Sequence, residues 1–373
     1  MASRRHALTG MLLVVAAAAG GWAAWWQLSG RYYQSTENAY AAGNLVEVTP
    51  QVAGTVIAIG ADNMQRVEVG QMLVRLDRAD AEVALAQAEA TLARAVREAR
   101  TLYGNNLALE ANVRVREAEL QRAEEFLARR EPLARQGVVS REEWDTALTA
   151  AAAARASLTA ARENLATNRV FTDKVKLEEQ PSVLLAAARV REAWLALQRT
   201  EIPAPVSGTV ARRSVQVGQR VAPGARLMAV VPLGDVWVDA NFKEAQLRDM
   251  RVGQPARVTA DLYGGTVEYR GRVAGLAAGT GGAFALLPPQ NATGNWIKVV
   301  QRVPVRIELD AAQLLEHPLR VGLSMTVEVE TRDTSGTQLA ALAGSAPAFA
   351  TEALTVPAAE ADARVRAIIA AHR

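Results

Sequence analysis

The chain has 373 residues, half of them hydrophobic, with a formal net charge of +3 and no cysteine. That length accommodates two or three modest domains. The lack of cysteine excludes disulfides, a thiol nucleophile and thiolate metal ligands, and the small, dispersed positive charge gives no support to nucleic-acid binding.

The N-terminal segment predicts a membrane anchor. Residues 7–29 carry no charge, end in a cluster of tryptophans and follow Arg4 and Arg5. About 20 apolar residues span a bilayer core, and preceding arginines favour a cytoplasmic N-terminus. We therefore expect residues 1–6 in the cytoplasm, a single pass through the inner membrane, and the bulk of the chain in the periplasm. The alternative is a cleaved signal peptide, since the alanine-rich stretch offers small-residue cleavage sites.

Two β-rich segments farther along the chain repeat each other. Residues 30–45 are expected to be a polar connector to the first segment, residues 46–77. The second segment, residues 201–232, aligns with the first without a gap at an offset of 154, so that Gly54 meets Gly208. Each is a run of short alternating strands separated by glycine turns. Because neither half can bury a face alone, we expect the two to pack on each other as one β-sandwich.

A helical excursion, residues 78–200, separates the two halves. Its first leg, residues 78–135, is dominated by Ala, Glu, Arg and Leu, and its leucines and valines recur at coiled-coil steps of seven and four. At about 1.5 Å per residue this leg would form a rod of about 85 Å. Ser140, with Glu143 three residues on, predicts a capping box at the start of the return leg. The pattern predicts a long antiparallel hairpin with its tip near residues 135–140.

Each leg contains a predicted interruption. Residues 101–106 include Gly104 and two asparagines, which are poor helix formers. The return leg loses its helical pattern from Phe171 to Pro181. The two stretches lie at comparable distances from the tip, so we expect both legs to break at about the same height.

The remainder of the chain changes texture. Residues 233–331 hold short alternating strands, glycine-rich turns and one short helix expected over Lys243–Met250, which together predict a small closed β-barrel. Residues 332–373 begin as a linker rich in small residues and end in an expected short helix, Ala358–His372. Nothing in this tail's composition indicates its purpose.

No catalytic site is predicted. His6, His317 and His372 lie in unrelated contexts, so neither a histidine metal site nor a catalytic triad is expected. Acidic residues mostly lie beside arginines on helix faces, where solvated pairing accounts for them. The glycines of residues 279–282 lack the lysine and the strand-to-helix frame of a phosphate loop. We expect no enzyme activity, no metal and no cofactor.

The order of segments resembles a known family, and three stretches carry the resemblance: ENAYAAGN at residues 37–44, WVDANFKE at 237–244 and LLPPQNATGNWIKVVQR at 286–302. The repeat is similar to lipoyl and biotinyl carrier domains, but neither half contains the lysine that those domains modify. Over about residues 5–332 the chain resembles the HlyD family of membrane fusion (periplasmic adaptor) proteins, of the EmrA multidrug-efflux type. The implied fold is α+β multidomain: an N-terminal transmembrane helix, a split lipoyl-like β-sandwich, a long antiparallel α-helical coiled-coil hairpin and a β-barrel.

The resemblance implies a non-enzymatic adaptor in a tripartite multidrug efflux pump. The anchor and barrel would lie beside an inner-membrane drug/proton antiporter of the major-facilitator type, and the hairpin would reach a TolC-like outer-membrane channel. Copies would associate as a trimer or a hexamer. Arg129, Leu133 and Ser140 match the Arg-x3-Leu-x6-Ser motif with which many such adaptors dock the channel, although Ser140 is also explained as a plain helix cap.

A long barrel loop, residues 279–296, carries much of the resemblance. We expect it to contact a neighbouring adaptor or the antiporter through Gln290, Asn291, Asn295 and Trp296. Two other functions stay open: an adaptor for export of a peptide, siderophore or aromatic acid, and a structural coiled coil that spans the envelope without a pump. The second leaves the barrel and its loop without a purpose.

Overall fold

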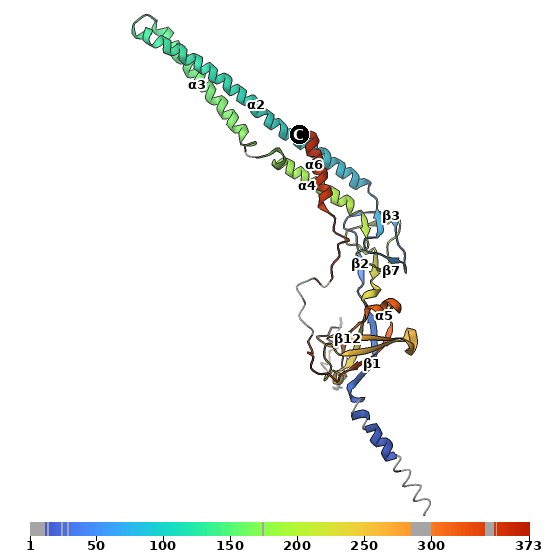
Figure 1. Ribbon diagram of the computed structural model, residues 1–373. Helices are drawn as coiled ribbons and strands as arrows, with labels where there is room; N and C mark the ends of the chain where they lie inside the picture. The colour runs from blue at the N-terminus through green and yellow to red at the C-terminus, as the bar shows by residue number, and fades with distance from the viewer. Residues whose placement is uncertain are drawn as a thin grey trace, which may run out of the picture.

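The computed structural model describes residues 12, 15–23, 25–27, 30–173, 175–284, 300–339, 347 and 349–373. Figure 1 shows an elongated molecule, with a long helical hairpin at one end, small sheets at its base, and a barrel followed by an N-terminal helix at the other end. The described residues before Gly30 are helical. None of the helices found in the described part of the chain is long and apolar enough to cross a membrane. The predicted cytoplasmic residues 1–6 and part of the predicted anchor, including residues 7–11, lie outside the described residues.

The two β repeats interleave instead of forming one sheet each. The two sheets have the strand orders β2–β9–β7–β4 and β6–β5–β3–β8, so each contains strands from both repeats. The equivalent strands β3 and β7 begin at Gly54 and Gly208, as the repeat predicts. The expected packing of the halves is therefore confirmed, with each completing the other's sheets around a shared apolar core. The strands are β2 (Val46–Val48), β3 (Gly54–Ile59), β4 (Arg66–Val67), β5 (Met72–Leu76), β6 (Glu201–Pro203), β7 (Gly208–Arg213), β8 (Arg220–Val221) and β9 (Met228–Val231).

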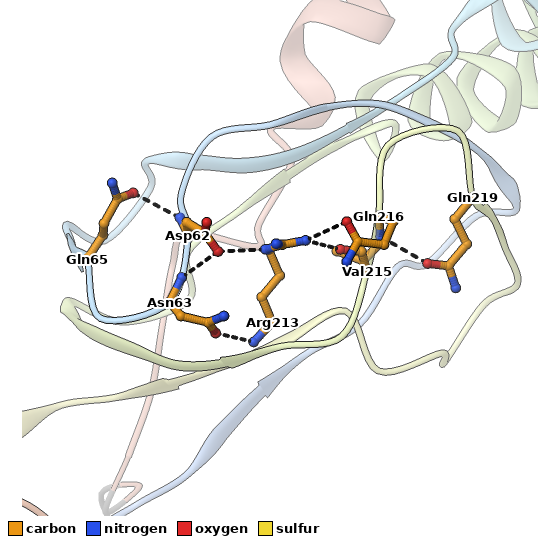
Figure 2. A network of polar contacts seen from close by, with 7 residues as sticks. All are labelled: Asp62, Asn63, Gln65, Arg213, Val215, Gln216 and Gln219. Atoms are coloured by element: carbon orange, nitrogen blue, oxygen red, sulfur yellow. Dashed lines mark hydrogen bonds and ion pairs between the residues drawn. The ribbon is translucent and has the colours of Figure 1, made fainter.

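Polar side chains join two equivalent turns of this sandwich, the turn after β3 and the turn after β7 (Figure 2). Arg213 Nε donates to Asp62 Oδ1 at 2.8 Å, and its backbone N–H donates to Asn63 Oδ1 at 2.7 Å. The Arg213 guanidinium also donates to the Val215 carbonyl at 2.6 Å. The hydrogen bond from Arg213, followed by that from the Asn63 N–H, lowers the pKa of Asp62 below its usual 3.8.

Each of these turns is closed in the same way. The Gln65 side-chain oxygen accepts from the Asp62 N–H at 2.9 Å, and the Gln219 side-chain oxygen accepts from the Gln216 N–H at 3.0 Å. The repeat is therefore preserved in the turn hydrogen bonds as well as in the strands.

The helical excursion is an antiparallel hairpin, as predicted (Figure 1). Its outward leg is one unbroken helix, α2 (Ala79–Arg135), and its return leg consists of α3 (Arg141–Arg169), the single turn η2 (Leu177–Glu179) and α4 (Pro181–Gln198). The expected break in the first leg is wrong, because α2 runs through Gly104 without interruption. The expected break in the return leg is present, between α3 and η2.

Polar side chains of α2 hydrogen-bond to residues in and beside the break of the return leg. The Tyr103 hydroxyl donates to the carbonyl of Val175, inside the break. Asn106 accepts a hydrogen bond from the side chain of Asn168, at the end of α3, at 2.8 Å, and donates to Thr172 in the break. A break needs partners for the backbone groups that leave the helix. The stretch that we expected to weaken α2 supplies partners for the other leg.

The β-rich region after the sandwich closes into a barrel with the strand order β1–β10–β13–β12–β11–β14, which confirms the predicted barrel. Its core contains fully buried side chains such as Tyr269, Phe242 and Ile307. The strands are β1 (Tyr33–Ala42), β10 (Trp237–Lys243), β11 (Pro255–Ala260), β12 (Glu268–Leu276), β13 (Arg302–Leu309) and β14 (Ser324–Glu330). Short helical segments are η1 (Gly30–Tyr32), η3 (Leu233–Asp235), η4 (Glu244–Leu247), η5 (Asp261–Thr266) and α5 (Ala311–Glu316).

Two expectations for this region are wrong. Most of the expected connector, residues 30–45, is strand β1, which pairs with β10 on one side and β14 on the other and so closes the barrel. Ala39 and Ala41 face the core while Tyr40 between them is exposed, which is the period-two pattern of a strand. The helix expected over Lys243–Met250 is only the 3₁₀ turn η4.

The C-terminal helix α6 (Ala358–His372) follows the barrel in sequence but packs on the hairpin. It lies beside α2 and α4 at the base of the hairpin (Figure 1). The tail thus passes from the barrel back to the hairpin.

Candidate functional site

The tip of the hairpin begins with a tightly closed helix end. Gly137 has φ +71°, the left-handed conformation that glycine adopts readily. The Val138 N–H donates to the Leu133 carbonyl at 2.9 Å, and the Gly137 N–H donates to the Ala134 carbonyl at 3.1 Å. These two bonds form a Schellman motif, which satisfies the last carbonyls of α2.

The return helix begins with the predicted capping box. Ser140 Oγ accepts from the Glu143 N–H, and Glu143 Oε2 accepts from the Ser140 N–H, both at 3.2 Å. The turn between α2 and α3 is therefore defined at both ends by local hydrogen bonds and needs no partner to hold its shape.

The structure locates all three predicted docking residues at this tip. Arg129 and Leu133 lie four residues apart on α2 and so share a face of the helix. Ser140 lies across the turn, at the start of α3. Arg129 is exposed and pairs with Glu125 at 3.8 Å, and the Leu133 side chain is 40% exposed. The Ser140 hydroxyl, by contrast, is engaged in its cap.

Val138 belongs to the same surface, and our sequence analysis did not select it. It is 69% exposed, more than Leu133. An apolar residue directly after the glycine of a Schellman motif normally contacts the residue that Leu133 represents here. That signal identifies the two positions as neighbours, and their exposure leaves an apolar patch at the end of the rod.

Side chains between the legs hold the tip at the end of a stiff rod. Arg169 pairs with Glu110 at 2.9 Å and Arg162 with Glu117 at 2.7 Å, and a third pair follows at the same seven-residue interval nearer the tip, Arg155 with Glu124. Beside this ladder lies a small apolar cluster of Val113, Leu158, Ala161 and Leu165. Charged pairs flanking an apolar seam are the arrangement of a coiled coil. The ladder fixes the register of the two legs.

The predicted barrel contacts cannot be placed in the same way. Gln290, Asn291, Asn295 and Trp296 lie outside the described residues. Their segment connects β12 to β13, two adjacent strands of the barrel. Within the described part of the chain no group of three or more His, Cys, Asp or Glu residues is arranged to hold a metal ion.

Comparison with known families matches the hairpin and the barrel separately. Residues 79–200 match the family described as EMRA, alpha-helical hairpin domain, and residues 235–330 match the AAEA-like beta-barrel domain. Among solved structures, the periplasmic adaptor protein EmrA aligns with 80% of this chain and 99% of its own, at 18% identity and a TM-score of 0.40. MacA from Actinobacillus actinomycetemcomitans aligns over 80% of both chains, at 18% identity and a TM-score of 0.44.

Sequence relatives cover most of the chain. Multidrug export protein EmrA of Escherichia coli (strain K12) is 47% identical over 87% of this chain and 83% of its own. Fatty acid resistance protein FarA of Neisseria gonorrhoeae is 53% identical over 79% of this chain and 75% of its own. Probable multidrug resistance protein EmrK of Escherichia coli (strain K12) is 42% identical over 95% and 92%. The chain therefore belongs to the HlyD family of membrane fusion proteins, and within it to the EmrA type.

Proposed function

We propose that this protein is the periplasmic adaptor of a tripartite multidrug efflux pump. Its N-terminal segment would anchor it in the inner membrane beside a drug/proton antiporter of the major-facilitator type, and its hairpin would dock a TolC-like outer-membrane channel. The relatives named for multidrug export and multidrug resistance support the pump assignment. We expect the adaptor to catalyse no reaction, because proton coupling and substrate gating would belong to the antiporter.

The observation that carries this proposal is the hairpin with its exposed apolar end. A helix of 57 residues is about 85 Å long, far longer than the roughly 30 Å of a bilayer core. The two legs contact each other through the ladder of ion pairs and the apolar cluster beside it. Leu133 and Val138 are exposed at the tip. A long coiled coil whose end carries exposed apolar side chains is suited to reach another protein.

At the tip we propose that Arg129 and Leu133 contact the channel, with Val138 extending the apolar patch. Arginine and a large aliphatic side chain can fill a groove between two helices, the arginine pairing with carbonyls or carboxylates at its rim. Ser140 holds the turn that presents them.

Site-specific cross-linking tests the proposal directly, because the chain has no native cysteine. Ser140→Cys in whole cells, treated with a short thiol-to-amine cross-linker, should capture an outer-membrane channel protein. Thr167→Cys is the matched control, because it is also an exposed hydroxyl residue on α3 but lies about 40 Å down the rod. Equal capture of the channel from both positions, or capture of a second adaptor alone from a folded and anchored protein, would contradict docking through the tip.

The relative named for fatty acid resistance favours a second substrate class. FarA is 53% identical to this chain, a higher identity than the multidrug export relative shows. Deletion of the gene followed by growth on a panel of uncouplers, dyes and long-chain fatty acids separates the classes. Sensitivity to fatty acids alone would assign a lipid-like substrate, and unchanged growth on the whole panel would favour a structural role.

We also propose that copies associate as a trimer or a hexamer through the barrel, with the loop containing Gln290, Asn291, Asn295 and Trp296 at a contact with the neighbouring adaptor or the antiporter. Trp296→Ala should then lower efflux several-fold while the protein stays folded and at wild-type abundance. Efflux assays in cells with matched expression measure this, and wild-type efflux in the variant would remove the loop from the interface.

A further inference from the structure

The C-terminal helix gives the base of the hairpin a third helix. Along α6, Ala361, Val365 and Ile369 are spaced four residues apart and are all buried, with Ala361 only 1% exposed. They join one apolar cluster with side chains of α2 and α4, among them Leu92 and Val190. Four-residue spacing places the buried residues on a single stripe of the helix. The groove between α2 and α4 therefore receives α6 as an amphipathic helix.

Complementary charges flank this stripe. The three pairs join α6 and the terminal residue to three different elements of the hairpin. They are Arg191 Nε with Asp362 Oδ1 at 2.6 Å on α4, Arg364 Nε with Glu89 Oε1 at 3.4 Å on α2, and Arg373 with Glu178 at 2.9 Å on η2. Pairs of both signs on both sides specify the orientation of the docked helix.

The residues just before α6 contact the sandwich. The Thr351 hydroxyl donates to the carbonyl of Pro205 at 2.6 Å. Residues 353–357 form one wall of a cavity whose other wall contains Gly70 and Met72 of the sandwich and Arg199 at the end of α4. Residues 349–373 thus touch both the hairpin and the sandwich.

The junction between those two parts has only two covalent connections. Asp77 and Arg78 join β5 to α2, and Arg199 and Thr200 join α4 to β6. Two short connections side by side form a hinge, and hinges are made of a few residues at element ends. A third contact between the hairpin and the sandwich, placed away from these two connections, would prevent the hairpin from rotating relative to the sandwich.

We propose that residues 349–373 are a brace that fixes the angle between the hairpin and the sandwich. The effect at the tip is large, because a rotation of about 10° at the base moves the end of a rod of about 85 Å by about 15 Å. Undocking α6 would release the hinge, and docking would aim the tip. This role does not depend on which channel or substrate the protein serves.

Distances between two spin labels measure the hinge directly. Leu107→Cys on α2 and Val217→Cys on the sandwich are both exposed, at 70% and 62%, and no native cysteine competes for the label. We expect a narrow distance distribution in the otherwise unaltered full-length protein. Ala361→Asp places a charge in the buried stripe and should broaden the distribution. Ala367→Asp, on the exposed face of the same helix, should leave it narrow.

Charge reversal provides a rescue that a general loss of structure would not show. Arg191→Glu opposes Asp362 and should broaden the distribution, and Asp362→Arg added to it should narrow it again. Arg189→Glu, exposed and two positions earlier on α4, is the matched control for Arg191→Glu. A distribution in Ala361→Asp as narrow as in the unaltered protein, with circular dichroism showing an intact hairpin, would overturn the brace.

Mixing two variants identifies which copy supplies the helix. A spin-labelled Arg191→Glu chain is combined with an unlabelled Asp362→Arg chain. If α6 docks on its own chain, the distance distribution of the labelled chain stays broad in the mixture. If the distribution narrows, α6 is exchanged between copies, and the proposal of an intramolecular brace is overturned.

Discussion

At the tip, Ser140 has a structural role that is complete without a partner. Its hydroxyl and the Glu143 carboxylate satisfy two backbone N–H groups at the start of α3. A channel-docking role for Ser140 therefore has to be separated from its cap.

Two substitutions at Ser140 separate them. Ser140→Ala removes the cap and should destabilise the hairpin by about 1 kcal/mol. Ser140→Asp keeps a capping acceptor and should change the free energy of unfolding by only about a few tenths of a kcal/mol from the wild-type value. Thermal unfolding measures stability, and an efflux assay measures docking. If efflux follows stability in both variants, the serine acts only as a cap. Loss of efflux in Ser140→Asp at wild-type stability would assign the hydroxyl itself to the contact.

Asp62 predicts a pH dependence with a definite sign. Its pKa is lowered below 3.8 in the folded protein by the Arg213 hydrogen bond. A lowered folded-state pKa stabilises the protein fully above the unfolded value and stops doing so as the pH falls through the folded value. The difference in Tm between wild type and Asp62→Asn should therefore be constant between pH 7 and about 5 and should shrink below pH 3.8.

Arg213→Ala is the control for this titration, because it removes the largest of the causes that lower the Asp62 pKa. In that background Asp62→Asn should change Tm and its pH dependence less than it does in the wild-type background, since only the Asn63 N–H then lowers the pKa of Asp62. A Tm difference that persists unchanged at pH 2.5 in the wild-type background would contradict the assignment of the ion pair.

At the scale of elements, alanine substitutions at Gly104 and Gly208 should have opposite effects on stability. Gly104 lies inside the unbroken α2, and a methyl group there would meet no atom within 4 Å. Gly104→Ala should stabilise the hairpin by about 0.5–1 kcal/mol, because alanine loses less backbone entropy in a helix. Gly208 starts β7, and a methyl group there would lie 2.4 Å from the Val231 carbonyl oxygen. Gly208→Ala should therefore destabilise the sandwich. Chemical unfolding monitored by circular dichroism distinguishes the two, and a destabilised Gly104→Ala would contradict a continuous α2.

The hairpin also shows which features local sequence patterns predict and which they do not. Heptad spacing predicts both legs, and the capping residues predict the tip, because these signals are local. Tyr103 and Asn106 of the unbroken α2 contact Val175 and Asn168, more than sixty residues away. From helix propensity alone we expected this stretch to interrupt α2. In the folded chain its polar side chains instead form hydrogen bonds with the return leg.

At the scale of the whole molecule, the chain crosses between its parts more often than its linear order indicates. Strand β1 precedes the sandwich in sequence and completes the barrel that follows it. Each of the two sandwich sheets takes strands from both repeats, and the C-terminal helix returns to the hairpin. A variant that removes one segment should therefore damage a distant part.

Truncation tests this. A chain that starts at Gly30 keeps β1 and should retain a closed barrel, whereas a chain that starts at Gly43 leaves β10 and β14 with unpaired edges. Hydrogen exchange at Asp239 of β10 and Val327 of β14, whose amides face β1, should be protected in the first chain and fast in the second. The amides of β7 in the sandwich are the internal control and should be protected in both. Equal protection of β10 and β14 in the two chains would show that β1 is dispensable.

Local patterns by themselves determined the hairpin, its tip, the duplicated β motif and the presence of a barrel. These follow from periodicity, capping residues and repeated glycines that act within a few turns or strands. The resemblance of three short stretches determined the family. The tertiary structure decided what each segment is paired with: β1 in the barrel, alternating repeats in the two sheets, polar α2 residues at the break, and α6 on the hairpin. Such choices depend on hydrogen-bond partners and buried faces that meet only after the chain has folded, because an alternating strand or an amphipathic helix carries no label for the surface that will cover it.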